Sequence, residues 1–104
     1  MSQNFIKVAT RDELPPGGKK LADVDGRAIA VFHCEGGYYA IDDVCTHEFA
    51  LLSQGFIEGG TIECPLHQAC FDIASGRCVS GPATVDLRAY EVKIDGGEVY
   101  VRAP

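Results

Sequence analysis

The sequence predicts an all-β protein, a small sandwich or barrel built from short antiparallel strands. Three observations support this: apolar residues alternate in short runs, glycine pairs separate several of these runs, and helical periodicity is nearly absent. Gly-Gly connections suit the primed turns that tight hairpins require. A chain of 104 residues is expected to form one domain around a single modest core.

The helical signal is confined to the stretch TRDEL, where Thr10 and Glu13 have the spacing of a capping box. Pro15-Pro16 ends this turn, because proline has no amide proton with which to continue it. We expect all other elements to be strands and hairpins. Their ranges are 27–34, 38–42, 55–64, 71–79 and 90–102.

The last hairpin shows the alternation most clearly. Its two arms flank a turn at Gly96-Gly97, and in both arms apolar residues alternate with charged residues or tyrosine. Such alternation is typical of a strand with one buried face and one solvated face. The residues expected on the buried face are Val92, Ile94, Val99 and Val101.

Charge and cysteine content limit the classes of function. Fifteen acidic and nine basic residues give a net charge of −6 without a long acidic block; this repels nucleic acid and attracts partners with a basic patch. No apolar run could span a bilayer and the start shows no secretory pattern, so we expect a cytoplasmic protein. Five cysteines, an odd number in a reducing compartment, favour metal ligation over disulfides.

Two short motifs carry the candidate ligands. Cys45 and His47 follow one expected strand, and Cys64 and His67 follow another after an interval of sixteen residues. Two Cys and two His could bind one tetrahedral Zn²⁺, but zinc sites usually group two cysteines in one knuckle and two histidines on a helix. A Rieske [2Fe–2S] centre instead binds two Cys on one iron and two His on the other. One donor of each kind in each loop favours this second arrangement.

The chain resembles the Rieske ferredoxins of bacterial aromatic-ring dioxygenase systems. The resemblance rests on C-x-H and C-x-x-H at the family's separation and on the surroundings CTHEFALLSQG, ECPLHQACFD and GPATVDLRAYEVKIDGGEVYV, within 38–102. It implies one [2Fe–2S] cluster and three small antiparallel sheets, with a cluster-binding subdomain at about 43–83 inserted in a basal β domain. Cys45 and Cys64 would bind the inner iron, His47 and His67 the outer iron, and Gly81-Pro82-Ala83 would form a third loop over the cluster.

The resemblance also indicates which kind of Rieske protein this is. The respiratory type has an extra Cys in each loop, forming a disulfide, where this chain has Ala50 and Leu66. That type also has Ser and Tyr hydroxyls that donate to cluster sulfur, where this chain has Ala69 and Phe71. Without those donors the reduced state is less stabilised, so we expect a potential of roughly −150 mV, near the low end of the Rieske range.

We expect an electron carrier rather than an enzyme. A catalytic mononuclear iron needs two further histidines and a carboxylate, and only His33 remains. The family role is transfer from an NAD(P)H-dependent flavin reductase to a terminal oxygenase, by a protein that is usually monomeric. Two alternatives stay open: a small Rieske subunit of another redox enzyme such as nitrite reductase, and a zinc-stabilised interaction domain. The candidate docking residues, chosen by their place around the outer iron, are Glu48, Phe49, Leu66, Gln68 and Pro82.

Several other conspicuous residues are expected to have structural roles. We interpret His33 as a hydrogen-bonded strand histidine, Cys34 and Cys78 as buried thiols, and Cys70 as a packing thiol beside the second motif. Asp42-Asp43 is expected to form a solvated loop. The aromatic residues expected in the core are Tyr38, Tyr39, Phe56, Phe71 and Tyr90.

Overall fold

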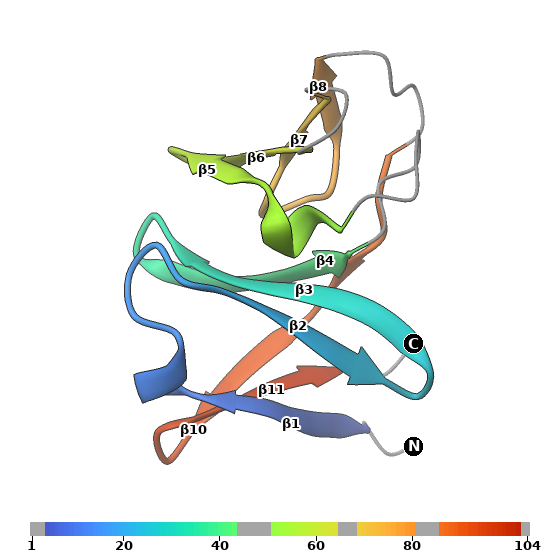
Figure 1. Ribbon diagram of the computed structural model, residues 1–104. Helices are drawn as coiled ribbons and strands as arrows, with labels where there is room; N and C mark the ends of the chain where they lie inside the picture. Colours follow the sequence, from blue (N-terminus) through green and yellow to red (C-terminus); the bar gives the residue numbers. More distant parts are fainter. Residues whose placement is uncertain (1–3, 44–50, 65–68, 81–85, 103–104) are drawn as a thin grey trace.

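The protein, seen in a computed structural model that describes residues 4–43, 51–64, 69–80 and 86–102, is built from strands, as predicted. Within these residues the strands form three antiparallel sheets arranged one above another (Figure 1). This arrangement confirms the three-sheet fold that the resemblance implied.

The lower sheet has the strand order β1-β11-β10, the middle sheet β2-β3-β4-β9 and the upper sheet, which we call the distal sheet, β5-β6-β7-β8. In the lower sheet the strands are β1 (Phe5–Thr10), β10 (Val92–Asp95) and β11 (Glu98–Arg102). The middle sheet contains β2 (Lys19–Val24), β3 (Arg27–Cys34), β4 (Gly37–Asp42) and β9 (Ala89–Tyr90). The distal sheet contains β5 (Phe56–Glu58), β6 (Thr61–Glu63), β7 (Cys70–Asp72) and β8 (Cys78–Ser80).

Strand β3 is buried on both faces, and it separates two apolar clusters rather than adding to a single core. Ile29 and Val31 pack towards the lower sheet, while Ala30, Phe32 and Cys34 pack towards the distal sheet. This double burial explains the nearly unbroken apolar run AIAVF, because a strand covered on both sides has no solvated face. The expected single core is therefore wrong: each outer sheet has its own cluster against the middle sheet.

Two short 3₁₀ helices, η1 (Arg11–Glu13) and η2 (Leu52–Gln54), connect strands in the described part of the chain. The predicted capping box is present at η1: the Thr10 hydroxyl accepts from the Glu13 amide at 3.3 Å, and the Glu13 carboxylate accepts from the Thr10 amide at 2.9 Å. The predicted turn at Gly96-Gly97 is also confirmed, with φ of 61° and 84° as a primed turn requires.

Two predicted core residues are instead exposed. Ile94 is 40 % exposed and Phe56 is 64 % exposed. Both lie on edge strands, β10 and β5, which have a neighbouring strand on one side only. The other residues expected on the buried face of the last hairpin divide differently: Val99 and Val101 are fully buried, and Val92 is partly buried.

Gly76 packs closely against the segment that leads from the distal sheet back to β9 of the middle sheet. Gly76 has φ of +78°, and a Cβ placed on it would lie 2.3 Å from the carbonyl oxygen of Leu87. Its own carbonyl accepts a hydrogen bond from the Leu87 amide at 2.7 Å. Only glycine combines this backbone conformation with so close an approach.

Replacing Gly76 with alanine should therefore destabilise the protein more than the same change at Gly26. Both glycines have φ near +80°, but a Cβ on Gly26 would meet nothing within 4 Å. G26A should cost about 1 kcal/mol of backbone strain, and G76A roughly 2 kcal/mol more because of the clash. Thermal unfolding followed by circular dichroism should place the G76A midpoint roughly 10 °C below that of G26A; equal midpoints would contradict this packing.

Candidate metal centre

The first predicted ligand loop is closed at its base by Asp43. Its carbonyl oxygen accepts a hydrogen bond from the Leu52 amide at 2.7 Å. Its carboxylate accepts from both the amide and the hydroxyl of Ser53, at 2.6 and 2.9 Å. The chain therefore leaves the end of β4 and returns to the start of η2 at the same point.

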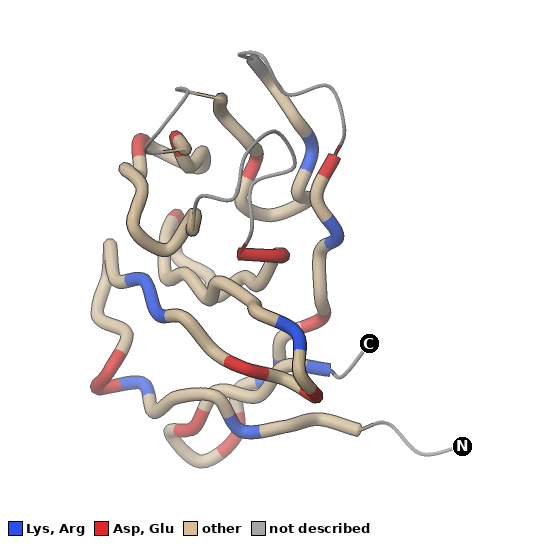
Figure 2. Tube along the Cα trace, turned by 45° about the vertical axis from the view of Figure 1, so that its right-hand side comes forward, with Lys and Arg blue, Asp and Glu red and all other residues tan. Residues whose placement is uncertain are grey.

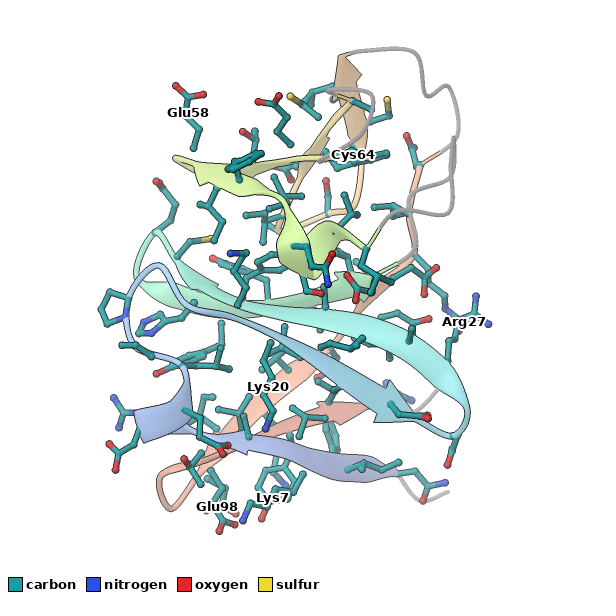
Figure 3. All side chains as sticks on the ribbon, viewed as in Figure 1. Lys7, Lys20, Arg27, Glu58, Cys64 and Glu98 are labelled. Atoms are coloured by element: carbon teal, nitrogen blue, oxygen red, sulfur yellow. The ribbon has the colours of Figure 1, made fainter. Side chains whose placement is uncertain are left out.

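The second loop is closed in a comparable way between β6 and β7. The Cys64 amide donates to the carbonyl oxygen of Ala69 at 2.7 Å, beside the antiparallel pair Glu63 and Cys70. The Cys64 side chain is only 1 % exposed. Figure 3 places Cys64 in the upper part of the molecule, far from Lys7 and Glu98 of the lower sheet.

A third pair of chain ends meets beside β8. The carboxylate of Asp86 accepts from the Cys78 amide at 2.9 Å, and the Leu87 amide donates to the Gly76 carbonyl at 2.7 Å. The segment between 80 and 86 thus begins and ends against the distal sheet.

All three loop bases contribute to one apolar cluster. Leu52 adjoins the first loop, Cys64 and Ala69 flank the second, and Leu87 follows the third, and all four pack in the cluster between the middle and distal sheets. The two loops with the predicted ligand motifs and the third loop therefore start from one shared apolar cluster, from which water is excluded. This is the arrangement that two ligand loops need in order to reach one cofactor.

Of the four predicted ligands, the structure describes Cys64. Cys45, His47 and His67 lie outside the described residues, and so do Ala50 and the third loop at Gly81-Pro82-Ala83. The docking candidates Glu48, Phe49, Leu66, Gln68 and Pro82 also lie outside them. Within the described ranges no group of three His, Cys, Asp or Glu side chains could hold a metal ion.

The donor chemistry of the described residues fits an iron–sulfur cluster of low potential. Cys64 is buried in the apolar cluster between the middle and distal sheets, and its sulfur is the ligand type by which iron–sulfur clusters are held. Ala69 and Phe71 are fully buried and carry no hydroxyl group, so neither side chain can donate a hydrogen bond to a cluster sulfur.

The remaining candidate residues have mostly structural roles. His33 lies in β3, where its Nδ1 donates to the Leu14 carbonyl at 2.7 Å and its ring stacks on Tyr38 with centroids 4.0 Å apart. This confirms the interpretation of a hydrogen-bonded strand histidine. Cys34 is buried as expected, and burial, helped by the nearby carboxylates of Glu35 and Asp72, raises the pKa of its thiol. Cys70 and Cys78 are partly buried, so the burial expected for Cys78 is incomplete.

The expectation that Asp42-Asp43 forms a solvated loop is wrong. Asp42 belongs to β4 and its Oδ1 accepts from Arg27 Nε at 3.1 Å and from the Tyr90 hydroxyl at 2.6 Å. Asp43 is fully buried. Sequence reasoning missed Asp43 because its partner, Ser53, lies ten residues further along the chain, and no local pattern announces the contact.

Comparison with known proteins agrees with this geometry. Residues 4–91 match the family model described as the Rieske [2Fe-2S] domain. The chain belongs to this family, and its cofactor is a Rieske-type [2Fe–2S] cluster.

Its relatives include the ferredoxins of aromatic dioxygenase systems. The chain is 43% identical, over 98% of both sequences, to the ferredoxin component of the naphthalene 1,2-dioxygenase/salicylate 5-hydroxylase systems of a Ralstonia species. Among solved structures, it matches the ferredoxin of carbazole 1,9a-dioxygenase from Nocardioides aromaticivorans with a TM-score of 0.93 and 37% identity, covering 97% of this chain and 99% of that one.

Two further solved structures match along nearly the whole chain. The complex of reduced oxygenase and oxidised ferredoxin in carbazole 1,9a-dioxygenase contains a chain that matches with a TM-score of 0.90 and 37% identity, over 97% of this chain and 94% of that one. A chain from Mycobacterium tuberculosis, named for the small subunit of an NADH-dependent nitrite reductase, matches with a TM-score of 0.89 over 100% of this chain and 98% of that one. At 20% identity, this match shows only that the two chains share a fold. Among the described residues no helix is long and apolar enough to cross a membrane.

Replacing Cys64 with serine should abolish cluster binding, because it removes one of the two thiolate ligands proposed for the inner iron. The matched control is Cys70→Ser, a partly buried cysteine on the adjacent strand. Iron and acid-labile sulfide analysis, with the visible spectrum, should show loss of the cluster in C64S and retention in C70S. A red-brown C64S protein with full iron content would contradict the assignment.

Stability should fall as the pH rises from about 10 through about 12 because of Tyr90. Burial, assisted by its hydrogen bond to Asp42, raises the pKa of this tyrosine from 10.0 to about 12. The unfolded chain therefore loses this proton first, so the stability contribution present below pH 10 is lost as the pH approaches 12. Urea unfolding of Tyr90→Phe across this range should show a shallower decline than the wild type; identical slopes would refute the linkage.

Proposed function

We propose that the protein carries single electrons in an aromatic-ring dioxygenase system, from an NAD(P)H-dependent flavin reductase to a terminal oxygenase. The observation that carries the proposal is the similarity, along nearly the whole length of both chains, to ferredoxin components of such systems. A related ferredoxin has been solved together with its oxygenase. The shared apolar base of the three loops is consistent with this role, since it would support a redox centre held by those loops.

The proposed ligands are Cys45 and Cys64 on the inner iron and His47 and His67 on the outer iron. The cluster they hold supplies reversible one-electron exchange. In the described part of the site, Cys64 is buried, and the side chains of Ala69 and Phe71 offer no hydroxyl that could donate to a cluster sulfur. These features support a potential near the low end of the Rieske range, and well above that of all-cysteine plant-type ferredoxins.

The histidine content and the relatives both support the conclusion that the protein transforms no substrate itself. The chain has three histidines, of which two are proposed ligands and the third, His33, donates its Nδ1 proton to Leu14. The relatives that match over the full length are named as ferredoxin components. The protein is thus the electron-transfer partner of an enzyme.

Charge is distributed unevenly between the two ends of the molecule. Residues 43–86, which include the distal sheet and all the proposed ligands, contain six acidic residues and one basic residue, Arg77. The rest of the chain has nine acidic and eight basic residues, and Figure 2 shows residues of both signs interspersed along the lower part of the trace. The ion pairs between described residues all lie in the rest of the chain, including Lys7–Glu98 and Arg27–Asp42. The excess negative charge therefore accompanies the redox centre.

This distribution supports docking through the end that holds the cluster, against partners whose surfaces are basic near their own cofactors. Such docking brings the outer iron close to the partner's redox centre. The proposed contact residues are those around the two ligand loops and the third loop, namely Glu48, Phe49, Leu66, Gln68 and Pro82. We further propose that the carrier is monomeric and that it lies in the cytoplasm, where its thiols stay reduced.

Reconstitution tests the function directly. The purified protein is combined with the reductase and oxygenase components of a naphthalene or carbazole dioxygenase system, and the oxidised aromatic product is measured. Product should form only when all three components and NAD(P)H are present. If the protein accepts no electrons from such reductases but copurifies with a nitrite reductase, the alternative assignment as a small subunit of that enzyme would be favoured.

Glu48→Gln should weaken transfer to the oxygenase, because it removes one charge from the proposed docking surface. Its matched control is Glu91→Gln, in the charge-balanced lower part of the molecule, where Glu91 pairs with Arg102. The KM for the ferredoxin should rise about 2- to 10-fold for E48Q at low salt, in line with about 0.5–1.4 kcal/mol for one interface charge, and should stay unchanged for E91Q. The difference should shrink at high ionic strength because salt screens exposed charges. Equal KM values for the two variants at low salt would exclude this docking surface.

A further inference from the structure

One charged side chain in the described structure is completely buried, and it belongs to Asp43. Its Oδ1 accepts from the Ser53 amide at 2.6 Å and its Oδ2 from the Ser53 hydroxyl at 2.9 Å. Both carboxylate oxygens are therefore held by the same residue, Ser53. Among the described residues no Lys or Arg forms an ion pair with Asp43. In its charged form Asp43 would thus carry a negative charge that the described neutral donors stabilise but do not cancel.

The position of Asp43 in the sequence places it beside the proposed redox centre. It precedes the proposed ligand Cys45 by two residues, so the two Cα atoms lie within about 7 Å of each other. Its carbonyl oxygen accepts from the amide of Leu52, and Leu52 packs in the apolar cluster that also contains Cys64. Asp43 therefore closes the first ligand loop next to that cluster.

The neighbouring acid is in a different electrostatic situation. Asp42 keeps a side-chain exposure of 20% and pairs with Arg27, whose guanidinium lies 3.1 Å away. Solvent and a positive partner both weaken its field. Because Asp43 is fully buried and has no Lys or Arg partner in the described part of the chain, its charge is screened less than that of Asp42.

We propose that the buried carboxylate of Asp43 lowers the reduction potential of the cluster. Reduction adds one electron, supplied by the reductase, and changes no bond or proton at Asp43. The added negative charge is disfavoured by a fixed negative charge nearby, so the oxidised state is stabilised relative to the reduced state. Asp43 is thus a tuning and positioning residue, in addition to the missing hydroxyl donors at Ala69 and Phe71. The inference rests on the ligand set of the proposed function.

Asp43→Asn tests the charge while conserving the shape of the side chain. The amide oxygen of asparagine can still accept from the Ser53 amide, and its NH₂ group can donate to the Ser53 hydroxyl. At an effective dielectric constant of about 20 and a separation of about 10 Å, loss of the charge should favour reduction roughly tenfold. For a one-electron couple this corresponds to about 59 mV in the positive direction. Spectroelectrochemical titration measures the midpoint, and reduced-state EPR confirms that the mixed His/Cys cluster is intact.

Ser53→Ala provides a test with the opposite sign. This variant keeps the carboxylate but removes one of its two donors, so the charge is less compensated and the midpoint should move to more negative values. If Asp43 acted only by holding the loop in place, both variants would loosen the same anchor and shift the midpoint in the same direction. Shifts of the same sign would overturn the proposal. Should D43N fail to retain its cluster, the sign of the S53A shift decides the question.

Glu58→Gln is the control for net charge. Glu58 is exposed on the distal sheet (Figure 3), so its removal changes the total charge by the same amount as D43N but at a solvent-screened position. The midpoint of E58Q should stay within a few millivolts of the wild type, and the D43N shift should persist at high salt. An unchanged D43N midpoint with a normal EPR signal would refute the role of Asp43 alone. Absence of a mixed His/Cys EPR signal from the wild type would instead refute the proposed ligands.

Discussion

The closure of three loops over one apolar cluster is the constraint on which the chemistry of this protein depends. Hydrogen bonds at Asp43, Cys64 and Leu87 bring the ends of each loop together, and the side chains next to these bonds pack between the middle and distal sheets. A small inorganic cluster tolerates little variation in the positions of its ligands. Loops whose ends are already fixed lose less conformational entropy when they bind the iron–sulfur cluster. The fold therefore increases the affinity for the cluster before any Cys or His side chain coordinates it.

Stability and electron transfer are assigned to different layers of the molecule. The lower and middle sheets enclose their own cluster, with Val99 and Val101 facing β3, and carry the ion pairs of the described structure. The distal sheet has short strands and depends on the opposite face of β3 for its burial. This division leaves the end with the proposed ligand loops free to meet the demands of potential and recognition, and it accommodates the buried Asp43 side chain, which a purely stabilising core would exclude.

Local patterns in the sequence predict much of this structure. The capping box at Thr10, the Gly-Gly turns and the doubly apolar run of β3 depend on neighbours close in the chain, and the spacing of the Cys and His motifs is by itself enough to indicate the family. The misplaced residues depend on distant partners. Phe56 is an aromatic residue of the kind expected in a core, but it lies exposed on an edge strand. Asp43 would be expected in solvent from its neighbours in the sequence, but it is buried and bonded to Ser53 of η2. The strands β1 and β2 were absent from the predicted elements because Lys and Asp interrupt their short apolar runs.

The uneven charge distribution also gives the molecule a permanent electric dipole, with its negative pole towards the proposed ligand loops. In the field of a basic partner such a dipole experiences a torque as well as an attraction. The carrier therefore turns towards its productive face during the approach, before any short-range contact forms. A shuttle that must bind, release and bind again can in this way shorten its rotational search without tightening the final complex, which keeps dissociation fast.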